Sequence, residues 1–292
     1  MVLPSAMKIT VIDSLTLPGN PQRPNEDASG WTDDAAFVID GATGLGSGIL
    51  VGDDNSDAAW LAAFAALNMT GMLERGHETA EIVRAINTLV GRFVDCMASE
   101  PPQGWQLPVA GFQMLRLENG GLVTSGLGDC TLFVLDAAGN ALAESPQPSH
   151  HAENAIAAAM IERAGGLSKL AVADRDAQTV DTLRASRAVF NTPGGPLWTL
   201  GAAPDAADHV VSAELAPALP ATALLASDGF AALVDTYRRY DAAGLVKAAR
   251  ERGLEELGGE LRRIEHEEDP EGRAFPRMKI SDDATALLIA IE

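Results

Sequence analysis

The sequence has few cysteines, few aromatic residues and few positive charges. Two of its 292 residues, Cys96 and Cys130, are cysteines, and aromatic residues make up 5%. Two cysteines build no disulfide framework, which indicates a reducing, cytoplasmic compartment. Lys and Arg number 21 against 41 Asp and Glu, so the net charge is -20. Such a surface repels nucleic acid and anionic membranes, and we expect neither as a partner.

Long apolar runs are also missing. The longest, Ala58–Leu67, is about half of what a membrane span requires. The segment Met1–Thr10 has one Lys and no apolar core, so no signal peptide is expected. At 292 residues, 47% of them hydrophobic, the chain can bury a large core in one domain spanning residues 1–292. The sequence makes no prediction of oligomeric state.

The apolar pattern predicts strands that pair as antiparallel hairpins. Short strands with turn residues between them over Gly111–Leu117, Leu122–Leu127 and Thr131–Leu135 indicate a β-meander, which argues against a doubly wound parallel sheet. Other strands are expected at Lys8–Leu17, from Ala35 to Asp40, at Ala221–Ala226 and at Ala284–Ile291.

Helical spacing predicts the remaining elements. Asp53, Asp54, Asn55 and Ser56 offer N-cap side chains for a first helix. A second helix, Glu78–Ser99, places seven apolar residues on one face: Ile82, Val83, Ile86, Leu89, Val90, Phe93 and Met97. Later helices are expected at Ala152–Ala164, from Phe230, at Ala242–Glu251 and at Leu254–Glu265. The acidic run Glu265–Glu271 is most simply a solvated helix end and loop.

The pattern weakens between about residues 145 and 220. This stretch holds Gly165-Gly166, a turn at Pro193–Pro196 and an Ala/Pro-rich segment. We expect it to form a lid or side subdomain, because weakly patterned insertions of this length are commonly functional.

Acidic residues recur at the ends of the predicted strands. Asn25-Glu26-Asp27 precede a strand, Asp40-Gly41 end one, Gly128-Asp129 interrupt a hairpin, Ser227-Asp228-Gly229 end another, and Asp282 precedes the last. Any one of them is most simply a turn residue. Together they suggest that some of the acidic residues are gathered to hold cations. The alternative explanation of the acid excess is solubility, for example in a salt-adapted host.

A convergence of carboxylates favours a hard metal. Oxygen ligands suit Mg²⁺ or Mn²⁺, whereas zinc favours His and Cys, and the five histidines have no zinc-like spacing. Two ions bridged by one carboxylate would hold a water between them and lower its pKa. Asp40 is the natural bridge, and the carbonyl of Gly41 is unobstructed by a side chain.

With these motifs in this order, the sequence resembles the metal-dependent protein phosphatase family, also called protein phosphatase 2C, from about Ile9 to Ile291. Asn25-Glu26-Asp27 resemble the family's first acidic motif and Asp40-Gly41 its Asp-Gly. The other matches are Gly128-Asp129-Cys130 to Gly-Asp-Ser, Ser227-Asp228-Gly229 to Ser-Asp-Gly, and Asp282-Asp283-Ala284-Thr285 to Asp-Asn-x-Thr.

The resemblance implies an α+β fold, a four-layer α-β-β-α sandwich of two antiparallel sheets with a binuclear metal site at one edge. It implies that Asp40 bridges two Mn²⁺ or Mg²⁺ ions, that Asp228 and Asp282 hold one, and that the Gly41 carbonyl holds the other. Glu26 or Asp27 would contact this second ion directly or through water. Asp129 would hold a possible third, weaker ion. Hydroxide on the bridged pair would attack phosphorus in line, without a covalent enzyme intermediate.

The sequence departs from the family at several positions. The family's phosphate-gripping Arg corresponds to Arg23, one residue closer to the acidic motif than usual, and an exposed loop Arg is an equal alternative. Many relatives have a His soon after Asp-Gly, but none follows Gly41 here. Thr131 replaces an Arg that often follows Gly-Asp-Ser. Trp198–Gly201 resemble a family segment that usually carries an Arg, and this segment has none.

The motifs favour a phosphatase that acts on phosphoserine or phosphothreonine in a protein or peptide. The missing Arg and His leave a second hypothesis, a phosphatase-like domain that binds a partner without turnover. A third is a metal-dependent hydrolase of a small phosphorylated metabolite. Mn²⁺-dependent turnover that Asp40→Asn abolishes would support the phosphatase. Substrate-trapping pull-downs would detect the binding domain, and a metabolite screen would detect the metabolite hydrolase.

Overall fold

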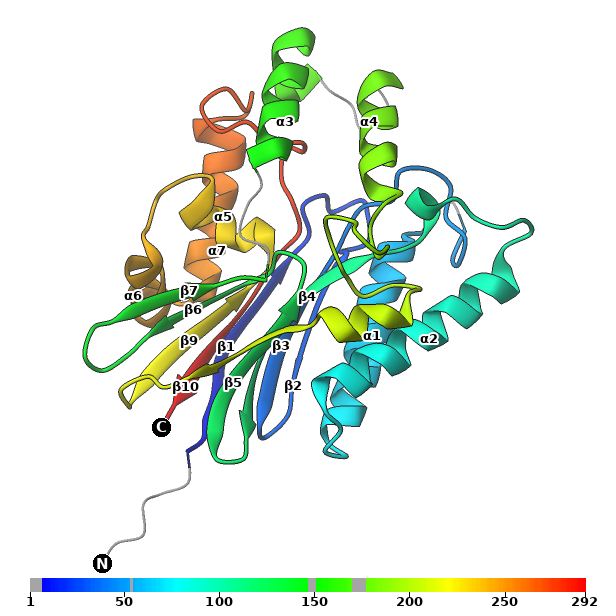
Figure 1. Cartoon of the computed structure of the whole chain (residues 1–292). Helices are drawn as coiled ribbons and strands as arrows, with labels where there is room; N and C mark the ends of the chain where they lie inside the picture. The colour runs from blue at the N-terminus through cyan, green and yellow to red at the C-terminus, as the bar shows by residue number, and fades with distance from the viewer. Residues whose placement is uncertain (1–6, 53–54, 147–150, 170–176) are drawn as a thin grey trace, which may run out of the picture.

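The structure is a computed structural model that describes residues 7–52, 55–146, 151–169 and 177–292. Its strands are β1 (Ile9–Leu17), β2 (Asp27–Trp31), β3 (Ala35–Gly41), β4 (Ala110–Glu118), β5 (Gly121–Leu127), β6 (Thr131–Leu135), β7 (Ala141–Glu144), β8 (Val211–Leu215), β9 (Ala221–Ala226) and β10 (Ala284–Ile291). They form two antiparallel five-stranded sheets, ordered β1-β10-β9-β6-β7 and β2-β3-β4-β5-β8, which face each other (Figure 1).

Helices cover both outer faces of this pair of sheets. The α-helices of the described residues are α1 (Asp57–Leu73), α2 (Thr79–Met97), α3 (His151–Ala164), α4 (Ala177–Arg187), α5 (Asp228–Asp235), α6 (Ala242–Arg252) and α7 (Leu254–Arg263). Helices α1 and α2 lie on the β2–β8 sheet, and α5, α6 and α7 lie on the other (Figure 1). The predicted four-layer α-β-β-α sandwich is therefore confirmed. Among the described helices, none has the length and apolarity to cross a membrane.

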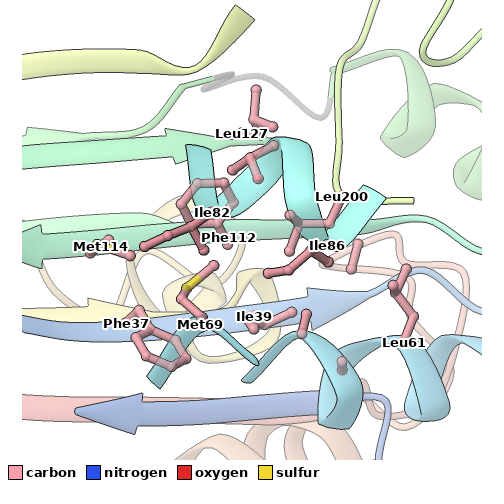
Figure 2. Close-up of a cluster of buried hydrophobic side chains, with 14 of the residues drawn as sticks. Phe37, Ile39, Leu61, Met69, Ile82, Ile86, Phe112, Met114, Leu127 and Leu200 are labelled. Atoms are coloured by element: carbon pink, nitrogen blue, oxygen red, sulfur yellow. The ribbon is translucent and has the colours of Figure 1, made fainter. Parts of the chain in front are cut away.

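Each central strand buries both of its faces, which explains its unbroken apolar sequence. In β3, Phe37 and Ile39 pack against α1 and α2, whereas Ala36 and Val38 pack between the two sheets. Figure 2 shows the outer cluster, where Met69 of α1 and Ile86 of α2 meet these β3 side chains. Full burial of one such large side chain stabilises the fold by about 1.5–3 kcal/mol. The layers thus fix β3, and with it the position of Asp40.

The prediction of one continuous meander is wrong at residue 128. Strand β5 pairs with β4 and β8, but β6 pairs with β7 and β9 in the opposite sheet. The chain crosses between the sheets at Gly128, whose φ is 82° and where a Cβ would lie 2.7 Å from the Cα of Gly111. A glycine predicts a change of chain direction, but it does not determine which strand the following strand pairs with.

The predicted apolar face of α2 is only partly buried. Ile82, Val83, Ile86 and Val90 are inside, but Leu89, Phe93 and Met97 are 37%, 42% and 58% exposed. Phe93 packs edge-on against Trp60 and Phe64 of α1 at 5.5 and 5.6 Å between ring centroids. The stripe is wider than the surface it covers, because α2 contacts the sheet through one side only.

The interpretation of residues 265–271 as a solvated end is also wrong in part. Helix α7 stops at Arg263 and continues as a π-helical turn, Ile264–Glu268. Glu265 and Asp269 are buried, because Arg262 donates to Glu265 at 2.7 Å and Arg277 donates to Asp269 at 3.1 Å. Arg262 and Arg277 lie only three and eight residues from these acids, but the charge run does not show which side chains the fold pairs.

The helices of the 145–220 segment stand above one edge of the sandwich. Helices α3 and α4 rise over the strand ends in Figure 1, whereas β8 pairs with β5, and Leu200 forms an isolated bridge with Ala110.

Ser56 caps α1 as predicted, accepting the N–H of Ala59 at 3.2 Å. Asp53 and Asp54 lie outside the described residues.

Candidate functional site

The acidic strand ends meet at a single edge of the sandwich. Asp40, near the end of β3, is opposite Asp27 at the start of β2 and Gly111 near the start of β4. In the other sheet, the end of β9 pairs with the starts of β6 and β10. Antiparallel pairing places starts beside ends. This edge lies below α3 and α4 in Figure 1.

A cleft of about 280 Å³ opens at this edge. It is lined by Asp40, Gly41, Asp129, Asp228 and Asp282, all of them predicted site residues. Helix α4 contributes the opposite wall with Leu183, Ser186 and Arg187. The tertiary structure therefore brings four of the predicted carboxylates and one predicted carbonyl together.

Asp40 is the most crowded of these carboxylates. Burial raises its pKa, and the negative charges of Asp228, Asp27 and Asp129 raise it further. The N–H of Asp228, in the first turn of α5, donates to its Oδ2 at 3.2 Å. A carboxylate in this position is stabilised by a proton or by a bound cation.

Asp27 shares this edge but is held by the protein itself. Its Oδ2 accepts the hydroxyl of Ser227 at 2.7 Å. Burial raises the pKa of Asp27, the Ser227 hydrogen bond lowers it, and the charges of Asp228 and Asp282 add to the rise. The balance is a pKa well above the ordinary value.

Glu26 and Arg23 line a smaller neighbouring cavity of about 110 Å³. The carboxylate of Glu26 accepts hydrogen bonds from the hydroxyls of Thr43 and Ser56. Arg23 is exposed on the rim of this cavity, outside the lining of the larger cleft. The two cavities adjoin, since Thr43 and Arg187 line both.

Gly41 is required by the packing around it. A Cβ there would lie 2.5 Å from the carbonyl oxygen of Glu26, and the Gly41 N–H donates to the same oxygen at 3.0 Å. Any side chain would push β3 away from residue 26. The glycine of the Asp-Gly motif thus keeps Glu26 and Asp40 close.

Two residues to which the sequence assigned no role complete the site. Asp283 accepts the N–H groups of Gly19 at 2.7 Å and Glu26 at 2.6 Å, so it ties the loop before β2 to β10. Lys279 donates from Nζ to Oδ1 of Asp282 at 2.7 Å. The available signal was a lone Lys three positions before Asp282 in an acidic chain.

The charge of Lys279 is favoured by its surroundings. Burial acts to lower its pKa, but the charges of Asp282, Glu26 and Asp228 outweigh burial, and the pKa is raised. Lys279 lines the same cleft as Asp40 and Asp228. The cleft therefore carries a positive group of its own among the carboxylates.

The donors suit a hard metal ion, although they are held by other partners in this arrangement. Among the residues described, no three His, Cys, Asp or Glu side chains are positioned to hold one ion together. The one thiol at the edge, Cys130, has its pKa raised by burial and by Asp40 and Asp129, so it stays protonated. Crowded carboxylate oxygens without a soft ligand fit Mg²⁺ or Mn²⁺.

No family model matches the sequence, and no curated protein matches it. Solved structures that share its fold include the following three. The PPM Ser-Thr phosphatase MsPP from Mycobacterium smegmatis, in complex with cacodylate, has a TM-score of 0.53 and 15% identity over 96% of this chain and 98% of its own. The catalytic domain of serine threonine protein phosphatase PstP, with 2 manganese ions, has 0.53 and 12% over 98% and 99%. RsbX with magnesium has 0.50 and 11% over 98% and 96%. The chain has the fold of the PPM phosphatases.

Proposed function

We propose that this chain is a metal-dependent phosphatase that removes phosphate from phosphoserine or phosphothreonine in proteins or peptides. The observation that carries the proposal is the cleft in which Asp40, Asp129, Asp228 and Asp282 converge with Gly41. The shared fold supports it, because two solved structures of that fold are named as serine/threonine phosphatases. Both free cysteines, Cys96 and Cys130, suit the cytoplasm that we propose as its location.

Two Mn²⁺ or Mg²⁺ ions, with a possible third, are the proposed cofactors. The PstP structure with 2 manganese ions and the RsbX structure with magnesium support this choice. Asp40 would help to hold both main ions. Asp228 and Asp282 would hold the first ion. The Gly41 carbonyl, with Glu26 or Asp27, would hold the second ion, and Asp129 would hold a third. When bound, such ions activate water and polarise phosphoryl oxygens.

Arginine side chains orient the substrate in this proposal. Arg187 of α4 lines both adjoining cavities, and Arg23 lines the smaller one. A guanidinium can hold two phosphate oxygens at once, which fixes the phosphoryl group against the carboxylate floor. Segment 145–220, which carries α3 and α4, would act as a lid over the bound phosphopeptide.

The described wall after Gly41 offers no acid to protonate the leaving oxygen. Ala42 and Thr43 line the cleft there, and none of its lining residues is a histidine. An aryl phosphate, whose leaving group needs no proton, should therefore be hydrolysed faster than a phosphothreonine peptide.

Hydrolysis of p-nitrophenyl phosphate and of a phosphothreonine peptide in Mn²⁺ tests the proposal. Asp40→Asn and Asp228→Asn should each lower kcat/KM by at least about 100-fold, because each removes a ligand. Asp95→Asn, an exposed position on α2, is the matched control and should leave the rate unchanged. Equal rates for wild type and Asp40→Asn would refute the proposal.

A second candidate is a phosphatase-like binding domain, supported by the partners that several carboxylates already have. Glu26 is held by Thr43 and Ser56, and Asp282 is held by Lys279. Calorimetry with a phosphothreonine peptide and its unphosphorylated form would detect a binder. Phosphate-dependent binding without release of phosphate over hours would favour this candidate, and fast turnover of a small phosphorylated metabolite would favour a metabolite hydrolase.

A further inference from the structure

Lys279 is placed so that it acts directly on a proposed metal ligand. It lies in the segment between the π-helical turn and β10, and its side chain is 29% exposed at the cleft. Its Nζ lies 2.7 Å from Oδ1 of Asp282. Arg262 donates to the backbone carbonyl of Asp282 at 2.8 Å. This bond anchors the backbone of Asp282, just before β10, while the carboxylate of Asp282 contacts Lys279.

The neighbouring cation Arg277 has a different role. Its guanidinium donates to Asp269 and to the carbonyls of Glu265, Phe275 and Ile280. These bonds fold the segment before β10 into a fixed loop. Arg277 therefore supports the loop, whereas Lys279 presents its charge to the carboxylates of the cleft.

We propose that Lys279 is a built-in counter-ion that competes with a divalent cation for the carboxylate of Asp282. The inference rests on the metal site of the proposed function and adds regulation of its loading. An ammonium and a metal ion at the same carboxylate repel each other, because each carries positive charge. In this proposal the ion displaces Lys279 from Asp282, and the affinity for the ion is lowered by that competition.

The same arrangement gives the cleft two charge states. Without metal, Lys279 neutralises Asp282 and reduces the repulsion between Asp282 and Asp228. With metal, Lys279 leaves Asp282 and becomes a mobile cation at the cleft, next to the position where a phosphoryl group would enter. A free ammonium with three donors suits a phosphate oxygen.

Calorimetric titration of the metal-stripped full chain with Mn²⁺ tests the competition. Lys279→Gln should bind the ion assigned to Asp228 and Asp282 at least about tenfold more tightly than wild type, since a charge in contact with Asp282 is removed. Lys279→Arg keeps the charge and should not show this gain. Lys247→Gln on α6, which lines a separate cavity, removes a distant Lys and should change little.

A double-mutant cycle distinguishes direct competition from a general change of charge. In an Asp282→Asn background the gain from Lys279→Gln should vanish, because the shared carboxylate is gone. A gain of equal size in that background overturns the proposal, as does a Lys279→Gln variant that binds Mn²⁺ no better than wild type.

A measurement on the unmodified chain covers the case of a variant that does not fold. Acetic anhydride should acetylate Lys279 several-fold faster when Mn²⁺ is present, as read by peptide mass spectrometry, while Lys247 serves as the internal reference. An unchanged rate under saturating Mn²⁺ overturns the competition alone. If neither wild type nor Lys279→Gln binds Mn²⁺ at all, the metal site of the proposed function fails with it.

Discussion

Asp269 and Asp40 are both enclosed by the fold, and the protein surrounds them with opposite kinds of group. Asp269 accepts the backbone N–H groups of residues 273 to 275 at 2.9–3.2 Å and pairs with Arg277 at 3.1 Å. Asp40 accepts the N–H of Asp228 at 3.2 Å and otherwise faces carboxylates, which raise its pKa after burial has done so. A structural acid is given its positive partners by the chain, whereas an acid of the cleft lacks that compensation.

Removing the charge of Asp269 should have the largest effect on stability of the substitutions that test this contrast. Asp269→Asn should lower the free energy of unfolding by about 3–5 kcal/mol, because it leaves the buried guanidinium of Arg277 without its counter-ion. Urea denaturation followed by circular dichroism measures the change. A loss below about 1 kcal/mol would mean that the backbone donors alone hold this loop.

Metal ions should supply the compensation that Asp40 lacks. Mn²⁺ at 100 times its Kd should stabilise the wild type by about 2.7 kcal/mol, since the ion binds the folded state alone. Thermal denaturation with Mn²⁺ and with EDTA measures this, and Asp40→Asn should respond much less. An identical rise in Tm for both proteins would place the ion elsewhere.

The same substitution at Asp40 should have the opposite sign from that at Asp269. In metal-free protein Asp40→Asn should raise the free energy of unfolding by about 0.5–2 kcal/mol, because it removes one of several crowded negative charges. Urea denaturation in EDTA measures the difference. A destabilised variant would show that the ionised carboxylate is already compensated within the fold.

The pH dependence should sharpen this last comparison. The pKa of Asp40 is raised above its ordinary value of 3.8, so the folded state holds its proton more tightly than the unfolded state. Between the two values the unfolding free energy of the wild type falls as pH rises. The advantage of metal-free Asp40→Asn should therefore grow as the pH rises from about 4 through the raised pKa of Asp40. A constant difference across this range would contradict the raised pKa.

Local sequence predicted most elements well. The bounds of β9 and β10 agree with the structure to the residue, because unbroken apolar runs end at charged or turn residues there. The capping residue Ser56 and the end of β3 at Gly41 were also readable. These features depend on neighbours along the chain, whose chemistry is printed in the sequence.

Features that depend on distant partners were predicted poorly. The crossing at Gly128 separates β5 from β6, whose pairing partners lie in different sheets. The sequence left Arg23 equally a phosphate contact or an exposed loop residue. The structure puts it, exposed, on the smaller cavity, where the phosphate contact stays a proposal. Arg187, which lines the cleft from α4, carried no motif at all.

By itself the sequence determined most of the strands and their acidic ends, because hydrophobic periodicity and turn chemistry are local properties. Only the tertiary structure decided which acids face each other and which are neutralised. Asp27, Asp40 and Asp282 look alike as strand-end aspartates, yet one is held by Ser227, one is crowded by carboxylates and one is paired with Lys279. Electrostatic energy depends on distance in space, and folding sets those distances.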